Sequence, residues 1–322
     1  MSWIQWATEN MVNGVPRDAL IDRMKQEGMP MVYVMEVLDC ANNKISEQYQ
    51  KLCSVVGNIQ KLQEQDPDYA TVEKINFPSE NVFFKEYWTK NKPVVIKDFA
   101  KAWPAISKWS FDYFADNYGD ELVEVQTKRE SDSDYELNSI AHKTKMPLRE
   151  FVAKIKSVDS SNDFYMTANN QAFKDTKLGD LLSDIGHVPS CLTEPRADGT
   201  TQLWMGPKGT VTPLHHDEIA IMHAQIVGRK KWKLISPFNT PNLYNHKAVF
   251  SQVDLENINY DRFPKMLDVK ILEVVVEPEE ALFIPIMWWH NVVSLDRSIS
   301  VQFYNFKYPN YWEYNNPTGA YQ

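Results

Sequence analysis

The last third of this 322-residue chain constrains the fold most, because after residue 200 it becomes a series of short apolar segments. Glycine, proline and charged turns separate them, and many short strands divided in this way are typical of a jelly roll or barrel. We therefore expect a mainly β core at about 200–306, with helices beside it. The expected strands are 202–206, 211–217, 219–227, 231–235, 269–276, 280–285, 288–294 and 298–306.

The chain before this core is expected to contribute two kinds of structure. Residues 1–70 form a helical N-terminal segment, which ends where Asp66-Pro67-Asp68 breaks the apolar periodicity. Residues 71–322 form the second domain, which opens with a mixed pattern of strands and helices. The helical patterns of the first segment lie at 17–27, 30–38 and 43–64, and the mixed part has strands at 93–96 and 122–125 and a helix at 147–155.

An apolar stripe follows one face of the third expected helix. Ile45, Tyr49, Leu52, Val56 and Ile59 recur at alternating steps of four and three residues. Such a helix either packs on its own domain or docks a partner, because a 3.5-residue repeat is also a coiled-coil seam. If the chain forms a homodimer, we expect this N-terminal helical segment to take part.

The potential metal ligands are concentrated in the run T-P-L-H-H-D at 212–217 and in the distant W-W-H at 288–290. Successive strand side chains point to opposite faces, so His215 and Asp217 share one face. Together with His290 they would form the set of two histidines and one carboxylate that non-haem Fe(II) oxygenases use. Spacing alone leaves His216 and Glu218 open as an equivalent pair on the opposite face. A buried histidine near a solvated aspartate is the simpler explanation of such a tripeptide taken alone.

The residues around these two runs resemble the JmjC/cupin-like family of Fe(II)- and 2-oxoglutarate-dependent oxygenases. The resemblance lies in 209–217, 224–232 and 283–296. The family's T-P-x-H-x-D pattern selects His215 and Asp217, and the third segment supplies His290. Within the family, the motifs are most similar to those of protein asparaginyl hydroxylases. The fold that the resemblance implies is a double-stranded β-helix, a jelly-roll barrel whose mouth holds the metal.

The resemblance also implies 2-oxoglutarate as cosubstrate, with its far carboxylate bound by a cation inside the barrel. Lys230 corresponds to the family's cosubstrate-binding lysine, and an ammonium with a carboxylate in a partly dry pocket makes a charge-assisted hydrogen bond. Thr212 and Tyr165 resemble hydroxyl donors to the same carboxylate, although a buried structural tyrosine fits the motif around 165 as well. Gln302 falls where the hydroxylases have an asparagine near the metal. Ile221 stands where relatives usually have another asparagine, so one polar contact near the 2-oxo acid end is lost.

The function so implied is a dioxygenase that hydroxylates a side chain of a peptide or protein. Its cofactors would be Fe(II), 2-oxoglutarate and O₂, with 2-oxoglutarate decarboxylated to succinate. Demethylation of N-methyl-lysine by the same chemistry stays open. So do a catalytically silent cupin binding module and a zinc-containing cupin isomerase or hydrolase, but neither gives a reason for Lys230.

Two further groups of residues refine these expectations. His223 lies an even number of positions after His215, which would place it on the same face of an unbroken strand, but the expected turn near Glu218 cancels that inference. His142, His187 and His246 lie in polar, loop-like stretches and are expected away from the metal.

Composition agrees with an enzyme of a reducing compartment. Cys40, Cys53 and Cys191 are odd in number and too scattered for a disulfide framework or a cysteine-rich zinc site. No secretory leader is apparent, and no apolar run approaches the roughly 18 residues of a membrane helix. We expect a cytoplasmic protein without membrane association. A net charge of −9 disfavours nucleic acid as the main partner.

Overall fold

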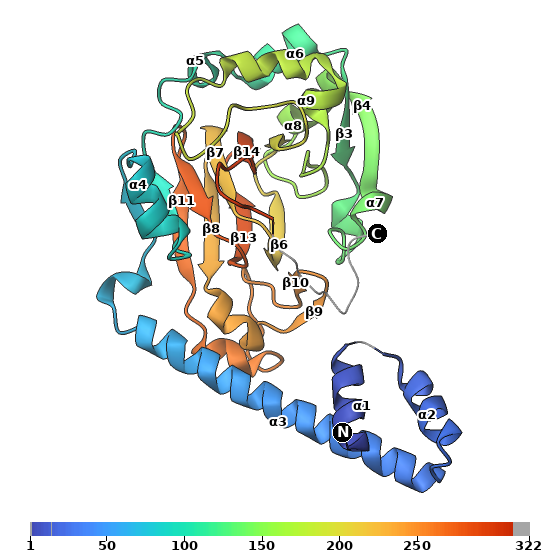
Figure 1. Ribbon diagram of the computed structural model, residues 1–322. Coiled ribbons are helices and arrows are strands. Elements are labelled where there is room, and N and C mark those ends of the chain that lie inside the picture. Colours follow the sequence, from blue (N-terminus) through green and yellow to red (C-terminus); the bar gives the residue numbers. More distant parts are fainter. Residues whose placement is uncertain (1, 14, 312–322) are drawn as a thin grey trace. The chain divides into compact units, whose positions relative to one another are not determined.

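The computed structural model describes residues 2–13 and 15–311, and the chain divides into two compact units, Met1–Asp66 and Pro67–Gln322 (Figure 1). Within the described residues, no helix has both the length and the apolar composition that spanning a membrane requires.

In its described part, the first unit consists of three helices, α1 (Trp3–Val12), α2 (Arg17–Gln26) and α3 (Met31–Gln63). Pro16 and Pro30 directly precede α2 and α3, where a residue without a backbone N–H leaves no donor unpaired. The three helices share a small apolar core of Ala7, Leu20, Met24, Val34, Val37, Leu38 and Ala41.

The first unit differs from the sequence prediction in two respects. The helices expected at 30–38 and 43–64 are one continuous helix, because residues 39–42 contain neither glycine nor proline to interrupt it. Helix α1 was not predicted at all. The second half of α3 exposes large apolar side chains, with Leu52 59% and Ile59 40% exposed.

The described part of the second unit is built on two six-stranded sheets, with strand orders β1-β2-β12-β7-β14-β5 and β11-β8-β13-β6-β10-β9. All pairings within them are antiparallel except that of β1 with β2. Strands β3 and β4 form a separate antiparallel pair. The strands are β1 (Glu73–Ile75), β2 (Val94–Ile96), β3 (Leu122–Gln126), β4 (Lys143–Pro147), β5 (Thr201–Gly206), β6 (Val211–His216), β7 (Ile221–Val227), β8 (Lys230–Ile235), β9 (Asn245–Lys247), β10 (Phe250–Ser251), β11 (Leu272–Val276), β12 (Ala281–Ile284), β13 (Trp289–Ser294) and β14 (Ser298–Phe303).

The two large sheets pack face to face. One apolar cluster joins Val95 and Leu282 of the first sheet to Trp232 and Val274 of the second. Two antiparallel sheets closed on a shared interior form a jelly roll. The prediction of a mainly β, cupin-like core with flanking helices is therefore confirmed, and the eight expected strands agree with the observed ones to within a few residues at each end.

Helices cover the outer face of the first sheet at one end (Figure 1). Phe114 of α6 and Phe151 of α8 share an apolar cluster with Leu203 of β5 and Phe303 of β14. The short helices of this unit are α4 (Glu80–Phe83), α5 (Pro104–Lys108), α6 (Phe111–Tyr118), α7 (Ser139–His142), α8 (Leu148–Ser157) and α9 (Ala172–Asp175), with a π-helical turn at Phe84–Trp88 and 3₁₀ turns at Pro67–Ala70, Arg129–Ser131, Lys177–Asp184, Pro237–Asn242 and Pro264–Asp268.

The tight turn from β7 to β8 requires glycine. Gly228 has φ of +70°, and a Cβ at this position would lie 2.2 Å from the carbonyl oxygen of Arg297. Only glycine adopts such a conformation without strain, and here it also avoids a clash with backbone. The turn sets the start of β8, and with it the position of Lys230.

Candidate metal and cosubstrate site

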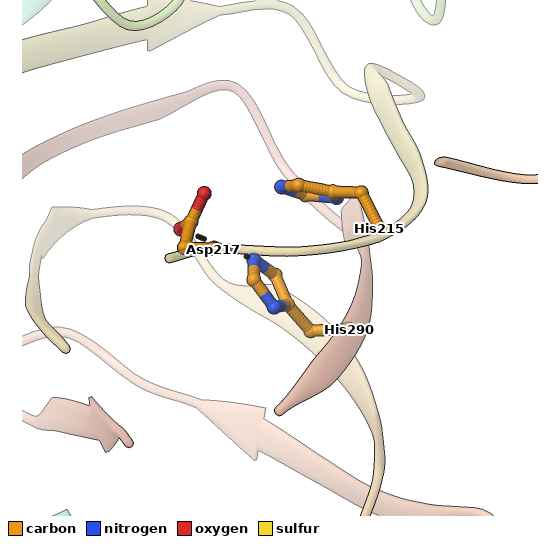
Figure 2. A group of neighbouring side chains, drawn as sticks. All are labelled: His215, Asp217 and His290. Atoms are coloured by element: carbon orange, nitrogen blue, oxygen red, sulfur yellow. Dashed lines mark ion pairs between the residues drawn. The ribbon is translucent and has the colours of Figure 1, made fainter. Parts of the chain in front are cut away.

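Strands β6 and β13 bring the three expected metal ligands together. His290 lies opposite His215 in the antiparallel pairing, and their ring centroids are 4.1 Å apart. Asp217 follows the end of β6, with its Oδ2 3.8 Å from His290 Nε2. One ligand atom from each residue lies within 4.8 Å of the other two, and the side chains converge in Figure 2. Within the described part of the chain, this is the one group of three such residues that converges.

Both histidines are oriented as metal ligands usually are. Nδ1 of His215 lies 2.8 Å from the carbonyl oxygen of Pro213, and Nδ1 of His290 lies 2.9 Å from that of Trp288. A carbonyl oxygen can only accept, so each Nδ1 carries the hydrogen and each Nε2 keeps its lone pair. Two Nε2 lone pairs and a carboxylate oxygen are the donor set of an Fe(II) facial triad, so these residues fit a divalent ion.

The electrostatics of the cluster also suit a cation. Burial lowers the pKa of His290 well below 6.5, and the nearby His215 lowers it further. Burial raises the pKa of the Asp217 carboxyl. Both shifts favour uncharged side chains, because this place is poorly hydrated. A divalent cation would stabilise the carboxylate and the neutral imidazoles at once.

The alternative pair, His216 and Glu218, does not converge with a third ligand in the described residues. The His216 ring packs edge-on against Trp289 at 4.6 Å, and Glu218 is exposed. The alternation of side chains along β6 thus separates His216 from His215. His142 lies elsewhere, with its Nε2 3.0 Å from Asp132.

The ligand cluster opens into a cavity of about 800 Å³, a usual volume for a small-molecule site. Trp204, Trp232 and Val292 contribute apolar walls to it. All the residues that sequence analysis assigned to metal or cosubstrate line this one cavity: His215, Asp217, His290, Lys230, Thr212, Tyr165 and Gln302.

Lys230 is buried inside the barrel without an acidic partner. Its side chain is 1% exposed, and Nζ donates hydrogen bonds to the hydroxyls of Tyr165 at 3.0 Å and Ser300 at 3.1 Å. None of the ion pairs among the described residues includes it. Burial lowers the pKa of Lys230 to about 7, because the ammonium has little solvation there. An anionic ligand in the cavity would supply the missing counter-charge.

Tyr165 and Thr212 supply hydroxyl groups to the lining of the same cavity. Tyr165 is buried, and burial raises the pKa of its hydroxyl, which therefore stays protonated. Thr212 lies on β6 opposite Val292 of β13, half-buried at the cavity wall. Both hydroxyls can thus donate to a ligand in the cavity.

Gln302 belongs to a polar chain along the interior of β7 and β14. Its Oε1 lies 3.3 Å from Nδ1 of His223, and its Nε2 donates to the Tyr304 hydroxyl at 2.6 Å. Burial lowers the pKa of His223 well below 6.5, the positive charge of Lys230 adds to this, and the amides of Gln302 and Gln225 oppose it. Ile221 begins β7 and lines the same cavity.

Sequence reasoning missed Ser300 and Tyr304, which contact Lys230 and Gln302. They lie two positions before and after Gln302, so strand alternation would have placed all three on one face. That signal was present in the sequence, but it becomes specific only once β14 is known to border the cavity.

Comparison with known proteins identifies the family. Residues 79–310 match the profile described as the cupin-like domain. The chain therefore belongs to the JmjC/cupin-like family. It is 34% identical over 241 residues to lysine-specific demethylase 8 of Xenopus tropicalis. The matched region covers 72% of this chain and 52% of that demethylase.

Two other relatives of this JmjC/cupin-like chain have names that refer to different activities. Lysine-specific demethylase JMJ30 of Arabidopsis thaliana is 33% identical over 243 residues, covering 72% of this chain and 54% of that protein. The tRNA wybutosine-synthesizing protein 5 of Gallus gallus is 23% identical over 231 residues, covering 68% and 72%. The chain spans about half the length of the two demethylases. These matches support the family and do not single out asparaginyl hydroxylases.

Proposed function

We propose that this protein is an Fe(II)- and 2-oxoglutarate-dependent dioxygenase that hydroxylates a side chain of a peptide or protein, and that residues 71–322 form its oxygenase domain. The observation that carries the proposal is the coexistence of two features in one cavity. A set of two histidines and one carboxylate converges at one place, and at another lies Lys230, which is buried and has no acidic partner among the described residues.

In this proposal, His215, Asp217 and His290 hold Fe(II), and Lys230 binds the far carboxylate of 2-oxoglutarate. Iron and 2-oxoglutarate supply the oxidising chemistry when bound: O₂ is reduced, the cosubstrate becomes succinate and CO₂, and one oxygen atom enters a substrate C–H bond. Tyr165 and Thr212 would donate further hydrogen bonds to the cosubstrate. The roles of the protein are to bind, to orient and to exclude water.

The apolar walls of the cavity would help to exclude water from the bound cosubstrate. Trp204 and Trp232 line it with large apolar faces. The Lys230 ammonium lies 5.5 Å from the Trp204 ring centroid, a cation–π distance that stabilises the charge without hydration. A carboxylate bound here would experience a lower dielectric than in water, so its pairing with Lys230 would be stronger.

A second candidate activity is the demethylation of N-methyl-lysine. The names of two relatives, both lysine-specific demethylases, favour it. Hydroxylation of an N-methyl carbon gives a product that releases formaldehyde, so the same site serves both reactions. The difference lies in which substrate carbon is presented. Either activity uses a peptide or protein substrate, which the net charge of −9 suits better than nucleic acid.

The activity is tested by incubating the protein with Fe(II), ascorbate, 2-oxoglutarate and peptide libraries, with succinate and peptide mass as readouts. Hydroxylation adds one oxygen atom to the peptide, whereas demethylation removes one CH₂ unit and releases formaldehyde. Succinate formation coupled to either change would support an oxygenase. Tight metal binding without 2-oxoglutarate turnover under any of these conditions would instead favour the silent binding module.

Lys231→Ala is a matched control for Lys230→Ala in this assay. Lys231 is the next residue on β8, but its Nζ pairs with Glu256 at 2.8 Å on the outer side of the strand. We expect Lys230→Ala to lose turnover and Lys231→Ala to keep it. Equal losses would mean that β8 is merely destabilised by either change.

We also propose that any homodimer of this chain involves α3. The second half of this helix exposes Tyr49, Leu52, Val55, Ile59 and Leu62, each at least 40%. Of these, Leu52, Val55, Ile59 and Leu62 follow one another at steps of three, four and three residues, the heptad spacing that suits a second copy of the same helix.

A further inference from the structure

His223 is a histidine inside the barrel to which the proposed iron and cosubstrate sites give no role. It lies on β7, opposite Gln302 of β14 and Leu282 of β12, and it is 1% exposed. Its side chain lines the same cavity as His290 and Lys230. A buried imidazole in a binding cavity needs a physical reason to be there.

One ring nitrogen of His223 lacks a hydrogen-bond partner among the described residues. Nδ1 lies 3.3 Å from Gln302 Oε1, whereas Nε2 is buried and no described atom meets hydrogen-bond geometry with it, although the Gln225 amide is close enough to the ring to raise its pKa. Buried polar atoms are nearly always hydrogen-bonded in proteins, so a ligand is the expected partner for one that lines a cavity. The ring also packs edge-on against Trp232 at 4.8 Å, which fixes its orientation.

Two tryptophans show where His223 lies along the cavity. The Trp232 ring is 4.8 Å from the His223 ring and 5.9 Å from the His290 ring. The Trp204 ring is 6.5 Å from the His223 ring and 5.5 Å from Lys230 Nζ. His223 therefore lies between the metal ligand at one end of the cavity and the lysine at the other.

We propose that His223 is a cosubstrate-binding residue, whose Nε2–H donates a hydrogen bond to a carboxylate oxygen of 2-oxoglutarate. The proposal rests on the proposed function, because it takes this 2-oxo dicarboxylate to span the metal ligands and Lys230. The side-chain amide of Gln302 presents either its oxygen or, after rotation, its NH₂ group to Nδ1. The imidazole can therefore carry a hydrogen on Nε2 in both its charged and its neutral form.

The position of Ile221 supports this role. Ile221 lies two residues before His223 on the same strand, so both side chains point to the same face, and both line the cavity. An isoleucine offers no hydrogen bond to a ligand there. His223 supplies a polar group one step further along the same inward face, and an amide at position 221 would reach the same part of the cavity.

The test is isothermal titration of the full-length protein, loaded with Mn(II), with 2-oxoglutarate. His223→Phe keeps a ring against Trp232 and removes both nitrogens. We expect the dissociation constant for 2-oxoglutarate to rise about tenfold or more, which is the usual effect of losing a hydrogen bond to a charged group. The affinity for Mn(II) should not change. His246→Phe, on exposed strand β9, is the matched control and should bind as the wild type does.

Rescue distinguishes a binding role from a structural one. The double variant Ile221→Asn with His223→Phe should recover much of the cosubstrate affinity, since the asparagine returns a donor to the cavity. If His223→Phe does not fold, His223→Leu replaces it in both variants, with the same expected losses and recovery.

Three results would overturn the inference. Unchanged cosubstrate affinity in His223→Phe would leave His223 as an internal link to the amides of Gln302 and Gln225, with the proposed function intact. A parallel loss of Mn(II) affinity would make it a structural residue. A wild-type protein that binds Mn(II) but no 2-oxoglutarate would refute the proposed function, and this inference with it.

Discussion

His290 lies opposite His215 across the β6–β13 pair, and a bulge in β6 follows directly. Between this pair and the next, Val292 opposite Thr212, β6 contains one residue more than β13. The additional length includes Pro213, which has no N–H to donate to the ladder, and bulges tolerate such a residue. The bulge bends β6 beside the candidate site, and the Pro213 carbonyl oxygen accepts a hydrogen bond from His215 Nδ1. The geometry of the cluster thus depends on cross-strand register as much as on the two motifs.

Removing the Tyr165 hydroxyl should weaken cosubstrate binding without affecting the metal ligands. Tyr165→Phe deletes an acceptor of the Lys230 ammonium at 3.0 Å and a donor to the proposed carboxylate. We expect a rise in the dissociation constant for 2-oxoglutarate of about tenfold, with unchanged Mn(II) affinity, by calorimetry. An unaltered dissociation constant would make Tyr165 a structural tyrosine only.

Cosubstrate binding should weaken as pH rises above about 7. Burial lowers the pKa of Lys230 to about 7 before the cosubstrate binds, so above that pH the neutral amine must take up a proton when the carboxylate binds. The dissociation constant should rise by up to about tenfold per pH unit between about pH 7.5 and 9. The neighbouring Tyr165 and His223 stay neutral there, because burial raises the pKa of the first and lowers that of the second.

Lys230→Arg is the control for this pH dependence, because a guanidinium stays charged throughout. Its cosubstrate affinity, whatever its value, should not change over the same range. The pH dependence of folding stability should have the opposite sign from that of cosubstrate binding. Between pH 7 and 10.5 the unfolded chain binds more protons at Lys230 than the folded one, so this residue's contribution to stability rises with pH. A dissociation constant that does not change with pH in the wild type would show that Lys230 is already charged before the cosubstrate binds.

Breaking the buried pair of Arg129 and Glu136 should destabilise the second unit. Arg129 is 0% exposed and donates to Glu136 Oε1 at 2.9 Å and to the Val211 carbonyl oxygen at 2.7 Å. Glu136→Gln leaves a buried guanidinium without its counter-charge, so the free energy of unfolding should fall by about 3 kcal/mol. The double change with Arg129→Met should lose less than the sum of the singles, as measured by urea unfolding. Additive losses would mean that the two charges are not coupled.

Charges on the exposed face of α3 should prevent any self-association of the chain. Leu52 and Ile59 lie on its apolar stripe and contribute nothing to the small core of the first unit. Leu52→Glu with Ile59→Glu should convert a dimer to a monomer in light scattering, with little change in the temperature of unfolding. Glu substitution at Gln50 and Ser54, two exposed residues on the opposite face of the same helix, is the control. A dimer that survives the stripe substitution would place the interface elsewhere.

The jelly roll could be predicted because its strands are short, apolar and separated by clear turns. The family's T-P-x-H-x-D pattern at 212–217 indicated which side chains of β6 share a face with His290, a choice that residue spacing alone left open. The helical segment was harder to predict. The helical patterns at 30–38 and 43–64 suggested two helices, whereas the uninterrupted backbone forms one.

Parts of the site that depend on register between strands could not be predicted from local pattern. The sheet face on which His223 lies could not be predicted, because the turn after β6 interrupts the strand and its alternation of side chains does not continue into β7. Ser300 and Tyr304 acquire meaning only from the pairing of β14 with β7. Motifs therefore identified the candidate ligands, and the long-range pairing supplied the rest of the cavity.

The most direct test of the proposed function is an anaerobic titration with Fe(II) and 2-oxoglutarate, monitored by the weak visible metal-to-ligand charge-transfer band. The wild type should develop the band, His215→Ala should lose it, and Lys230→Ala should require much higher 2-oxoglutarate concentrations. Iron binding by the wild type without the band at any 2-oxoglutarate concentration would contradict the account, because the cosubstrate would then not chelate the metal.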